Sequence, residues 1–164
     1  MAVGEPVSRI LAIDPGTTES AWVVYDPEAR RVIGSATEEN ALVMARVRWF
    51  DRSEAPTVFA VEMIASYGMP VGAEVFATCV WIGRFAEAWD SANHTPARLI
   101  FRRQVKLHLC ADSRAKDANI RQALLDRFGG REAAIGKKKS PGPLHGVTGD
   151  AWSALAVAIT AAET

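Results

Sequence analysis

The hydrophobic pattern at the start of the chain predicts three strands. Mainly apolar residues fill 8–14 and 20–26, and a third such run covers 30–36 after a turn at Asp26 and Pro27. Gly, Pro and Asp between apolar runs are typical of the turns that connect strands. Because the connections are short, we expect these strands to form an antiparallel meander.

A helix and a fourth strand are predicted next. Apolar residues recur at helical spacing over 37–50, and Thr37 and Asn40 offer side chains that cap a helix at its start. The run at 57–63 is typical of a short buried strand, with Glu62 at its end. The segment therefore predicts a helix followed by a strand.

The second half of the chain is mainly helical in pattern. We expect a long apolar helix at 73–89, a strand at 96–101, two polar helices at 102–109 and 115–128, and a last helix at 148–162. Together with the meander, this order predicts an α/β fold with a mixed five-stranded sheet covered by helices on both faces.

One segment lacks such a pattern. Residues 129–147 are rich in Gly, Lys, Ser and Pro, and few of them are apolar enough to offset the entropy lost on ordering. We expect a flexible loop there. The length of 164 residues otherwise predicts a single domain over 1–164.

Composition is that of a globular protein. Hydrophobic residues make up 49% of the chain and charged residues 23%, and no run approaches the roughly 18 apolar residues of a membrane span. Cys79 and Cys110 lack metal-ligand spacing, and residues 1–10 lack the pattern of a signal peptide. We therefore expect a cytoplasmic protein without a membrane partner.

The charge is distributed unevenly, although the formal net charge is zero. Between residues 98 and 139 there are twelve Lys or Arg and four Asp or Glu, which gives a local excess of +8. Such a basic stripe is typical of a surface that binds a polyanion, and equally of a solvated helical surface.

Three carboxylates are candidates for metal binding. Asp14 ends the first predicted strand, Glu62 ends the fourth, and Asp150 is expected at the first or second position of the last helix. Carboxylates that converge repel one another, and a hard divalent cation relieves that repulsion. A pair of Mg²⁺ or Mn²⁺ ions would then activate water against a phosphodiester.

Each of these acids also has a structural interpretation. Asp14 precedes Pro-Gly, where an aspartate commonly accepts hydrogen bonds from turn amides, and Asp150 is a favourable charge at a helix start. Glu62 follows apolar residues, so it needs a cationic neighbour if it is buried.

Five segments, in order and at comparable spacing, resemble the RuvC-type Holliday-junction resolvases of the RNase H-like superfamily, including phage relatives: LAIDPGT, FAVEM, RRQVK, SRAKDANIRQAL and DAWSALAVAI. The resemblance implies that Asp14, Glu62 and Asp150 bind metal and that Lys106 and Lys116 serve DNA contact and catalysis. It further implies a homodimer that makes symmetric nicks across a four-way DNA junction.

Two positions depart from that family. Ser153 stands where a second acid is usual on the last helix; a serine can hold a metal-bound water without supplying charge, and His145 or Asp117 are candidates to compensate. The loop after Glu62 lacks the aromatic residue expected close behind the glutamate. Tyr67 lies further on, where it either stacks on an unpaired base or packs in the loop.

The remaining DNA-contact candidates belong to the basic stripe. Lys106 and Lys116 lie on consecutive predicted helices, where an ammonium group can stabilise charge at a phosphate. A lysine run in 129–147 is interpreted as a phosphate-contacting arm or a mobile loop. The other candidates are Arg102, Arg103, Lys137, Lys138 and Lys139.

Other functions stay open. A nuclease with relaxed specificity for flaps and forks keeps the same chemistry, whereas a non-catalytic junction-binding protein would have lost it. DPGTTES also resembles a phosphate hairpin of sugar kinases, but that fold needs two domains and this chain is too short. The helix at 73–89 is apolar around much of its circumference, which favours a dimer contact or core burial.

Overall fold

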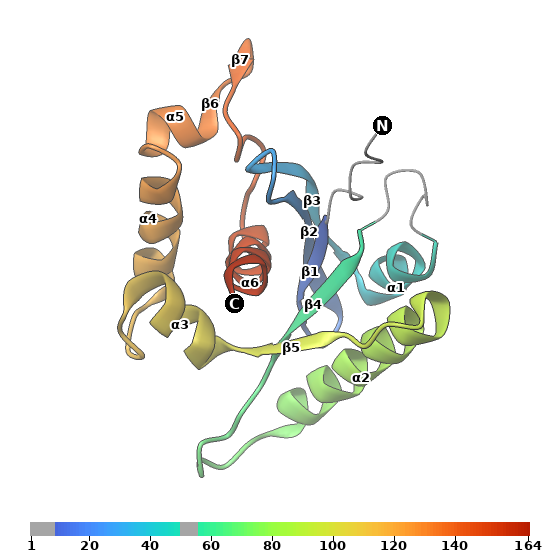
Figure 1. Cartoon of the computed structure of the whole chain (residues 1–164). Helices are drawn as coiled ribbons and strands as arrows, with labels where there is room; N and C mark the ends of the chain where they lie inside the picture. Colours follow the sequence, from blue (N-terminus) through green and yellow to red (C-terminus); the bar gives the residue numbers. More distant parts are fainter. Residues whose placement is uncertain (1–8, 50–55) are drawn as a thin grey trace.

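The computed structural model describes residues 9–49 and 56–164. Five strands form one sheet in the order β3-β2-β1-β4-β5 (Figure 1). Neighbours are antiparallel from β3 to β1 and parallel from β1 to β5, so the predicted mixed sheet is confirmed. The strands are β1 (Ile10–Asp14), β2 (Glu19–Asp26), β3 (Arg31–Glu39), β4 (Val58–Met63) and β5 (Arg98–Phe101).

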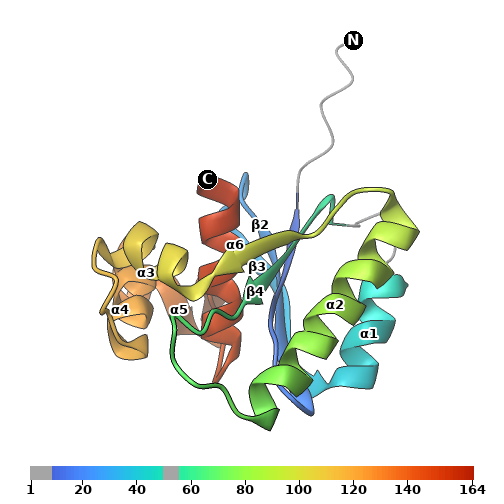
Figure 2. The same cartoon turned by 90° about the horizontal axis from the view of Figure 1, so that it is seen from below.

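Helices cover both faces of this sheet (Figures 1 and 2). On one face lie α1 (Asn40–Arg48) and α2 (Ala73–Asn93). On the other, α6 (Ala151–Glu163) packs directly on the strands, and α3 (Arg102–Cys110) and α4 (Asp117–Arg127) pack against α6. None of the described helices is both long and apolar enough to cross a membrane.

Alternation along the two central strands decides which face each acid occupies. Ile13 belongs to the core under α1 and α2, whereas Ala12 and Ala60 belong to the core under α6. Because side chains alternate with a period of two, Asp14 and Glu62 fall on the α6 side of the sheet. Both acids therefore face the same helical layer.

The first helix begins later than the sequence pattern predicts. Residues 37–39 continue β3, and α1 starts at Asn40, while residue 50 of the predicted helix lies outside the described residues. The amide of Asn40 is buried, accepts a hydrogen bond from Ser20 Oγ (2.6 Å) and donates one to the carbonyl of Gly16 (3.0 Å). These distant partners, rather than helix capping, determine where the strand ends.

The segment predicted as a flexible loop, 129–147, has regular structure. It contains α5 (Arg131–Ile135) and a hairpin of β6 (Gly136–Lys137) and β7 (Ser140–Pro141). Leu144 is fully buried in the core under α6, and its amide donates a hydrogen bond to the carbonyl of Ala134 (2.8 Å). A few apolar anchors thus offset an otherwise polar composition.

Candidate active site

Two of the predicted acids lie side by side at one edge of the sheet. β1 and β4 are parallel neighbours, with Ile13 opposite Val61, so the next residues along the strands are Asp14 and Glu62. Glu62 is buried, with 9% of its surface exposed. The amide of Gly16 in the following turn donates to Ser20 Oγ (3.1 Å), so this turn amide does not need Asp14.

The third acid lies at the start of the helix that faces them. Asp150 directly precedes α6, one residue before the first helical position, so the predicted placement inside the helix was wrong by one residue. Its carbonyl accepts from the amides of Ser153 (3.0 Å) and Ala154 (3.2 Å). The carboxylate makes no capping hydrogen bond to the described helix, which leaves it available to a ligand.

A cavity of about 360 Å³ connects the end of β4 with the starts of α3, α4 and α6. Asp14 is not among the residues that line it, although its carboxylate is near enough to those of Glu62 and Asp150 for their charges to act on its pKa. Figure 2 shows the first turn of α6 at the same end of the sheet as the loop after β4, with the C-terminus at the other end. We call this cavity the carboxylate cavity and define it by five of the residues that line it: Glu62, Arg102, Asp117, Asp150 and Ser153.

Burial and neighbouring negative charges make the acids at the carboxylate cavity harder to ionise. Burial, followed by the negative charges of Glu62 and Asp150, raises the pKa of Asp14 from 3.8 to about 7. Burial likewise raises the pKa of Glu62, while the positive charge of Arg102 opposes the shift. The cavity therefore favours an additional positive charge.

Arg102 is the cation that a buried Glu62 requires. Its Nη1 lies 3.4 Å from Glu62 Oε2, and its Nη2 contacts Asp117 Oδ1. Lys106, one turn further along α3, also acts on Glu62 and lowers its pKa. Sequence reasoning placed Arg102 only in the DNA-binding stripe; the missed signal was a basic residue directly after the strand that pairs with β4.

The donor set suits a hard divalent cation in kind and in charge. Carboxylate oxygens are the ligands that Mg²⁺ and Mn²⁺ prefer, and here they crowd one another without enough counter-charge. As they stand, the described His, Cys, Asp and Glu side chains form no group of three close enough to share an ion. The residues that would hold one are Asp14, Glu62 and Asp150.

Asp117 and His145, the two candidates to compensate for Ser153, differ in position. Asp117, at the start of α4, lines the carboxylate cavity, as Ser153 itself does. Asp117 also acts on Asp14 and Glu62, raising the pKa of both. The Nδ1 of His145 instead lies 2.9 Å from the carbonyl oxygen of Ile135, near the β6–β7 hairpin, and His145 is not among the residues that line the cavity.

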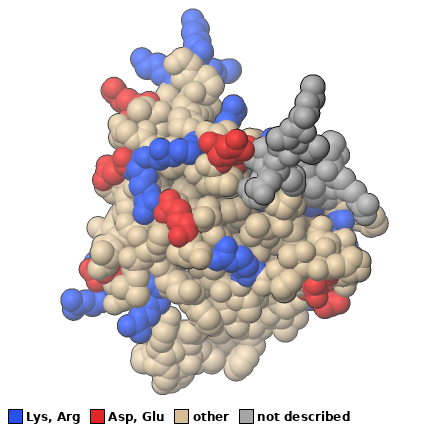
Figure 3. Space-filling model, viewed as in Figure 1, with Lys and Arg blue, Asp and Glu red and all other residues tan. Residues whose placement is uncertain are grey.

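The predicted DNA-contact residues are distributed over a wider surface. Lys116 caps α4 directly before Asp117, and Arg103 follows Arg102; both are exposed. The lysines of the β6–β7 hairpin are exposed too, and Lys and Arg side chains gather at its projecting end (Figure 3). Tyr67 lies in the loop after β4 with 63% of its surface exposed, so it does not pack there.

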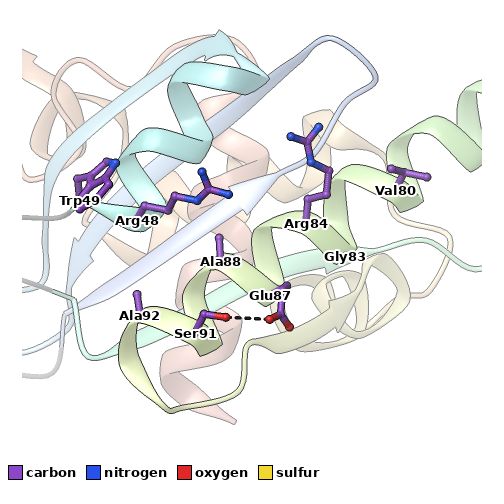
Figure 4. A pocket seen from close by; sticks show the side chains of 9 residues that line it. All are labelled: Arg48, Trp49, Val80, Gly83, Arg84, Glu87, Ala88, Ser91 and Ala92. Carbon is purple, nitrogen blue, oxygen red and sulfur yellow. Dashed lines mark hydrogen bonds between the residues drawn. The ribbon is translucent and has the colours of Figure 1, made fainter.

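A larger hollow lies away from these acids. We call this hollow, about 960 Å³ in volume, the helix groove (Figure 4). It is lined from α2 by residues that include Val80, Arg84, Glu87 and Ser91, and from the end of α1 by Arg48 and Trp49. Ser91 Oγ donates to Glu87 Oε1 (2.8 Å), and the Arg84 guanidinium lies 3.9 Å from the centre of the Trp81 ring. These charged groups thus already have partners.

The fold is similar to that of solved structures of Thermus thermophilus RuvC. One such structure has 21% sequence identity and a TM-score of 0.65, over 94% of this chain and 93% of that one. Another, of T. thermophilus RuvC in complex with a Holliday junction substrate, has 19% identity and a TM-score of 0.66, over 94% and 92%. No family model matches the sequence, and no curated protein matches it significantly.

Proposed function

We propose that this protein is a metal-dependent endonuclease that resolves four-way DNA junctions by symmetric phosphodiester nicking. The observation that supports the proposal is that Asp14 and Glu62 lie near the ends of adjacent parallel strands, and that Asp150, at the start of the facing helix, is near enough for its charge to act on the pKa of Asp14. The same fold in T. thermophilus RuvC has been solved with a Holliday junction substrate, which supports this choice of substrate.

Each acid has a role that follows from its surroundings. Two Mg²⁺ or Mn²⁺ ions, when bound, would supply charge stabilisation at the phosphate and a more acidic water. Asp14 and Glu62 are fixed by buried strands, so they hold their oxygens in place with little loss of side-chain entropy. Asp117 adds negative charge at the cavity, which supports it over His145 as compensation for Ser153.

The lysines serve the phosphate. Lys106 is close enough to Glu62 to act on its pKa, which supports a role for its ammonium at a phosphate held near the acids. Lys116, directly before Asp117, is exposed at the first turn of α4 and supplies a second ammonium. Arg103, the exposed Tyr67 and the hairpin lysines contact the junction arms and centre.

Symmetric nicking requires two active sites, so we propose a homodimer through α2. One side of this helix is buried on the sheet at Ile82, Phe85 and Trp89, while Phe76 and Val80 are 62% and 61% exposed. At Gly83 the backbone is open, with no heavy atom within 4 Å of a built Cβ, so a partner helix can approach closely. A second copy would cover this apolar side.

Two alternatives share the fold. A nuclease for flaps and forks would use the same acids. The exposed Tyr67 is able to stack on an unpaired base in any of these branched substrates, so it does not distinguish them. A non-catalytic junction-binding protein would bind DNA without cutting it. Metal dependence and substrate preference separate the three.

The decisive assay compares end-labelled four-way junction, flap, fork and linear duplex, each with Mg²⁺, with Mn²⁺ or with EDTA. We expect paired nicks in the junction with either ion, products with 5′-phosphate ends, and no cutting in EDTA. Equal cutting of linear duplex would contradict junction selectivity. Equal cutting of flaps and forks would favour the nuclease of relaxed specificity, and binding without cutting would favour the non-catalytic junction-binding protein.

A further inference from the structure

Arg102 occupies the place where positive charge is most needed in the carboxylate cavity. Its two terminal nitrogens reach two different acids, Glu62 from β4 and Asp117 from α4. Of these acids, Glu62 is buried and Asp117 is largely exposed, with 77% of its side-chain surface accessible. The guanidinium thus bridges the inside of the cavity and its rim.

A guanidinium at Glu62 and a divalent cation at Glu62 would repel each other. Both would lie within hydrogen-bonding or coordination distance of the same carboxylate, where burial weakens the screening of their repulsion by water. Glu62 is 9% exposed, so little water would separate two cations that share its carboxylate. The two cations therefore compete for Glu62.

The position of Arg102 gives its side chain somewhere to go. It is the first residue of α3, and 36% of its side-chain surface is exposed, so rotation outward needs no rearrangement of the core. The exposed Arg103 and the nearby Lys106 make the same end of the helix a basic surface. A phosphate group there would accept hydrogen bonds from both terminal nitrogens, in place of the single contacts that they make to Glu62 and Asp117.

Resting on the proposed function, we propose that Arg102 is an exchangeable counter-ion. In the ion-free protein its guanidinium neutralises Glu62; when a divalent cation binds, the guanidinium leaves Glu62 and binds a phosphate of the DNA substrate. Metal binding and DNA binding then strengthen each other. A metal ion at Glu62 releases Arg102 for the DNA, and DNA bound to Arg102 leaves Glu62 free for the metal ion. Thermodynamic linkage makes this effect reciprocal.

The first test is the affinity for Mn²⁺ in the absence of DNA, measured by calorimetry at neutral pH. Arg102→Gln should bind Mn²⁺ about tenfold more tightly than the wild type, within the usual range of coupling between sites. Arg103→Gln, which removes the adjacent charge but has no carboxylate partner among the described residues, should change the affinity less than about twofold. Unchanged or weaker binding in Arg102→Gln would overturn the proposal.

The second test is the coupling itself. Junction affinity is measured by fluorescence anisotropy with Ca²⁺ and with EDTA, and a gel confirms that the DNA is intact. In the wild type, Ca²⁺ should tighten junction binding by about tenfold or more. In Arg102→Gln this gain should shrink to the part that comes from neutralising the negative charge of the acids. A gain equal to that of the wild type would contradict the exchange.

Two further variants keep the result interpretable. Arg102→Lys retains the charge but reaches one carboxylate at a time, so its Mn²⁺ affinity should fall between those of the wild type and Arg102→Gln; it also serves if the glutamine variant is poorly folded by circular dichroism. Glu62→Gln tests the site itself. Loss of Mn²⁺ binding there, with no effect of Arg102→Gln, would sink only the exchange, whereas unchanged binding in Glu62→Gln would sink the proposed metal site.

Discussion

The carboxylate cavity and the helix groove differ in the burial of their charged side chains and in its effect on their pKa values. The groove is more than twice as large, about 960 Å³ against about 360 Å³. Two of its charged side chains, Glu87 and Arg84, are exposed and have close partners, Ser91 and the Trp81 ring. The smaller cavity holds Glu62, a buried acid, beside Asp14, whose pKa is raised to about 7.

This difference separates a place for chemistry from a place for contact. Acids whose pKa stays raised by burial, such as Glu62 in spite of Arg102, gain most from a bound ion, whereas exposed groups that already have partners gain little. The groove instead continues onto the exposed apolar side of α2 at Val80, which suits a protein partner. Volume alone favours the groove, whereas the raised pKa values of the acids favour the cavity as the place for chemistry.

The sharpest way to break the comparison is to remove one negative charge beside the carboxylate cavity and one in the helix groove. Asp14→Asn should reduce junction cleavage by about a thousandfold or more with junction binding retained, because metal stabilisation of the reacting phosphate is worth several kcal/mol. Glu87→Gln in the helix groove should leave the rate within about twofold of the wild type, consistent with a surface change. Similar rates of the two variants in single-turnover assays would remove the distinction.

The raised pKa of Asp14 predicts a dependence of stability on pH. Since the folded pKa of about 7 exceeds the ordinary value of 3.8, the folded state holds its proton longer, and stability falls as pH rises from about 4 to about 7. Above pH 7, in EDTA, Asp14→Asn should therefore be more stable than the wild type by on the order of 4 kcal/mol at most. Near pH 4 the two proteins should unfold at similar temperatures.

Mg²⁺ provides the control for this pH effect. An ion bound to the ionised acids should raise the melting temperature of the wild type at pH 8 and leave that of Asp14→Asn nearly unchanged. A gap between the two proteins that is independent of pH in calorimetric scans would show that Asp14 is ionised throughout the range.

Lys116 tests whether the rim of the carboxylate cavity takes part in the reaction. Replacing Lys116 by Met should slow cleavage by about a hundredfold, because an ammonium group that stabilises developing charge acts mainly in the transition state. Junction affinity, measured at fixed salt concentration, should fall far less. Comparable losses in rate and affinity would reassign Lys116 to simple phosphate contact.

The helix groove and the adjoining side of α2 are tested by oligomeric state. We expect a dimer at micromolar concentration in sedimentation equilibrium, and Val80→Asp should weaken it by about tenfold or more, since a charge would be buried against an apolar partner. Glu28→Gln, a change at an exposed position outside α2, should dimerise normally. A monomeric wild type would restrict the groove to some other role.

Predictability from the sequence followed the range of the interactions. The strand pattern gave five strands in the right order, and the buried runs correctly located Asp14 and Glu62 at strand ends. Besides the shift of one residue at Asp150, errors arose at Asn40, which bonds to Ser20 and Gly16 instead of starting the helix earlier, and at Leu144, where one buried side chain anchors a polar segment. Both depend on partners far away in the chain.

The sequence by itself determined which residues carry charge at the ends of apolar strands, because the alternation of apolar and polar positions is a local property. Only the tertiary structure decided that Asp117 and Arg102 join those acids while His145 does not, and that one side of α2 stays uncovered. The physical reason is that burial and Coulomb interactions depend on distance in space, and strand pairing and helix packing set that distance.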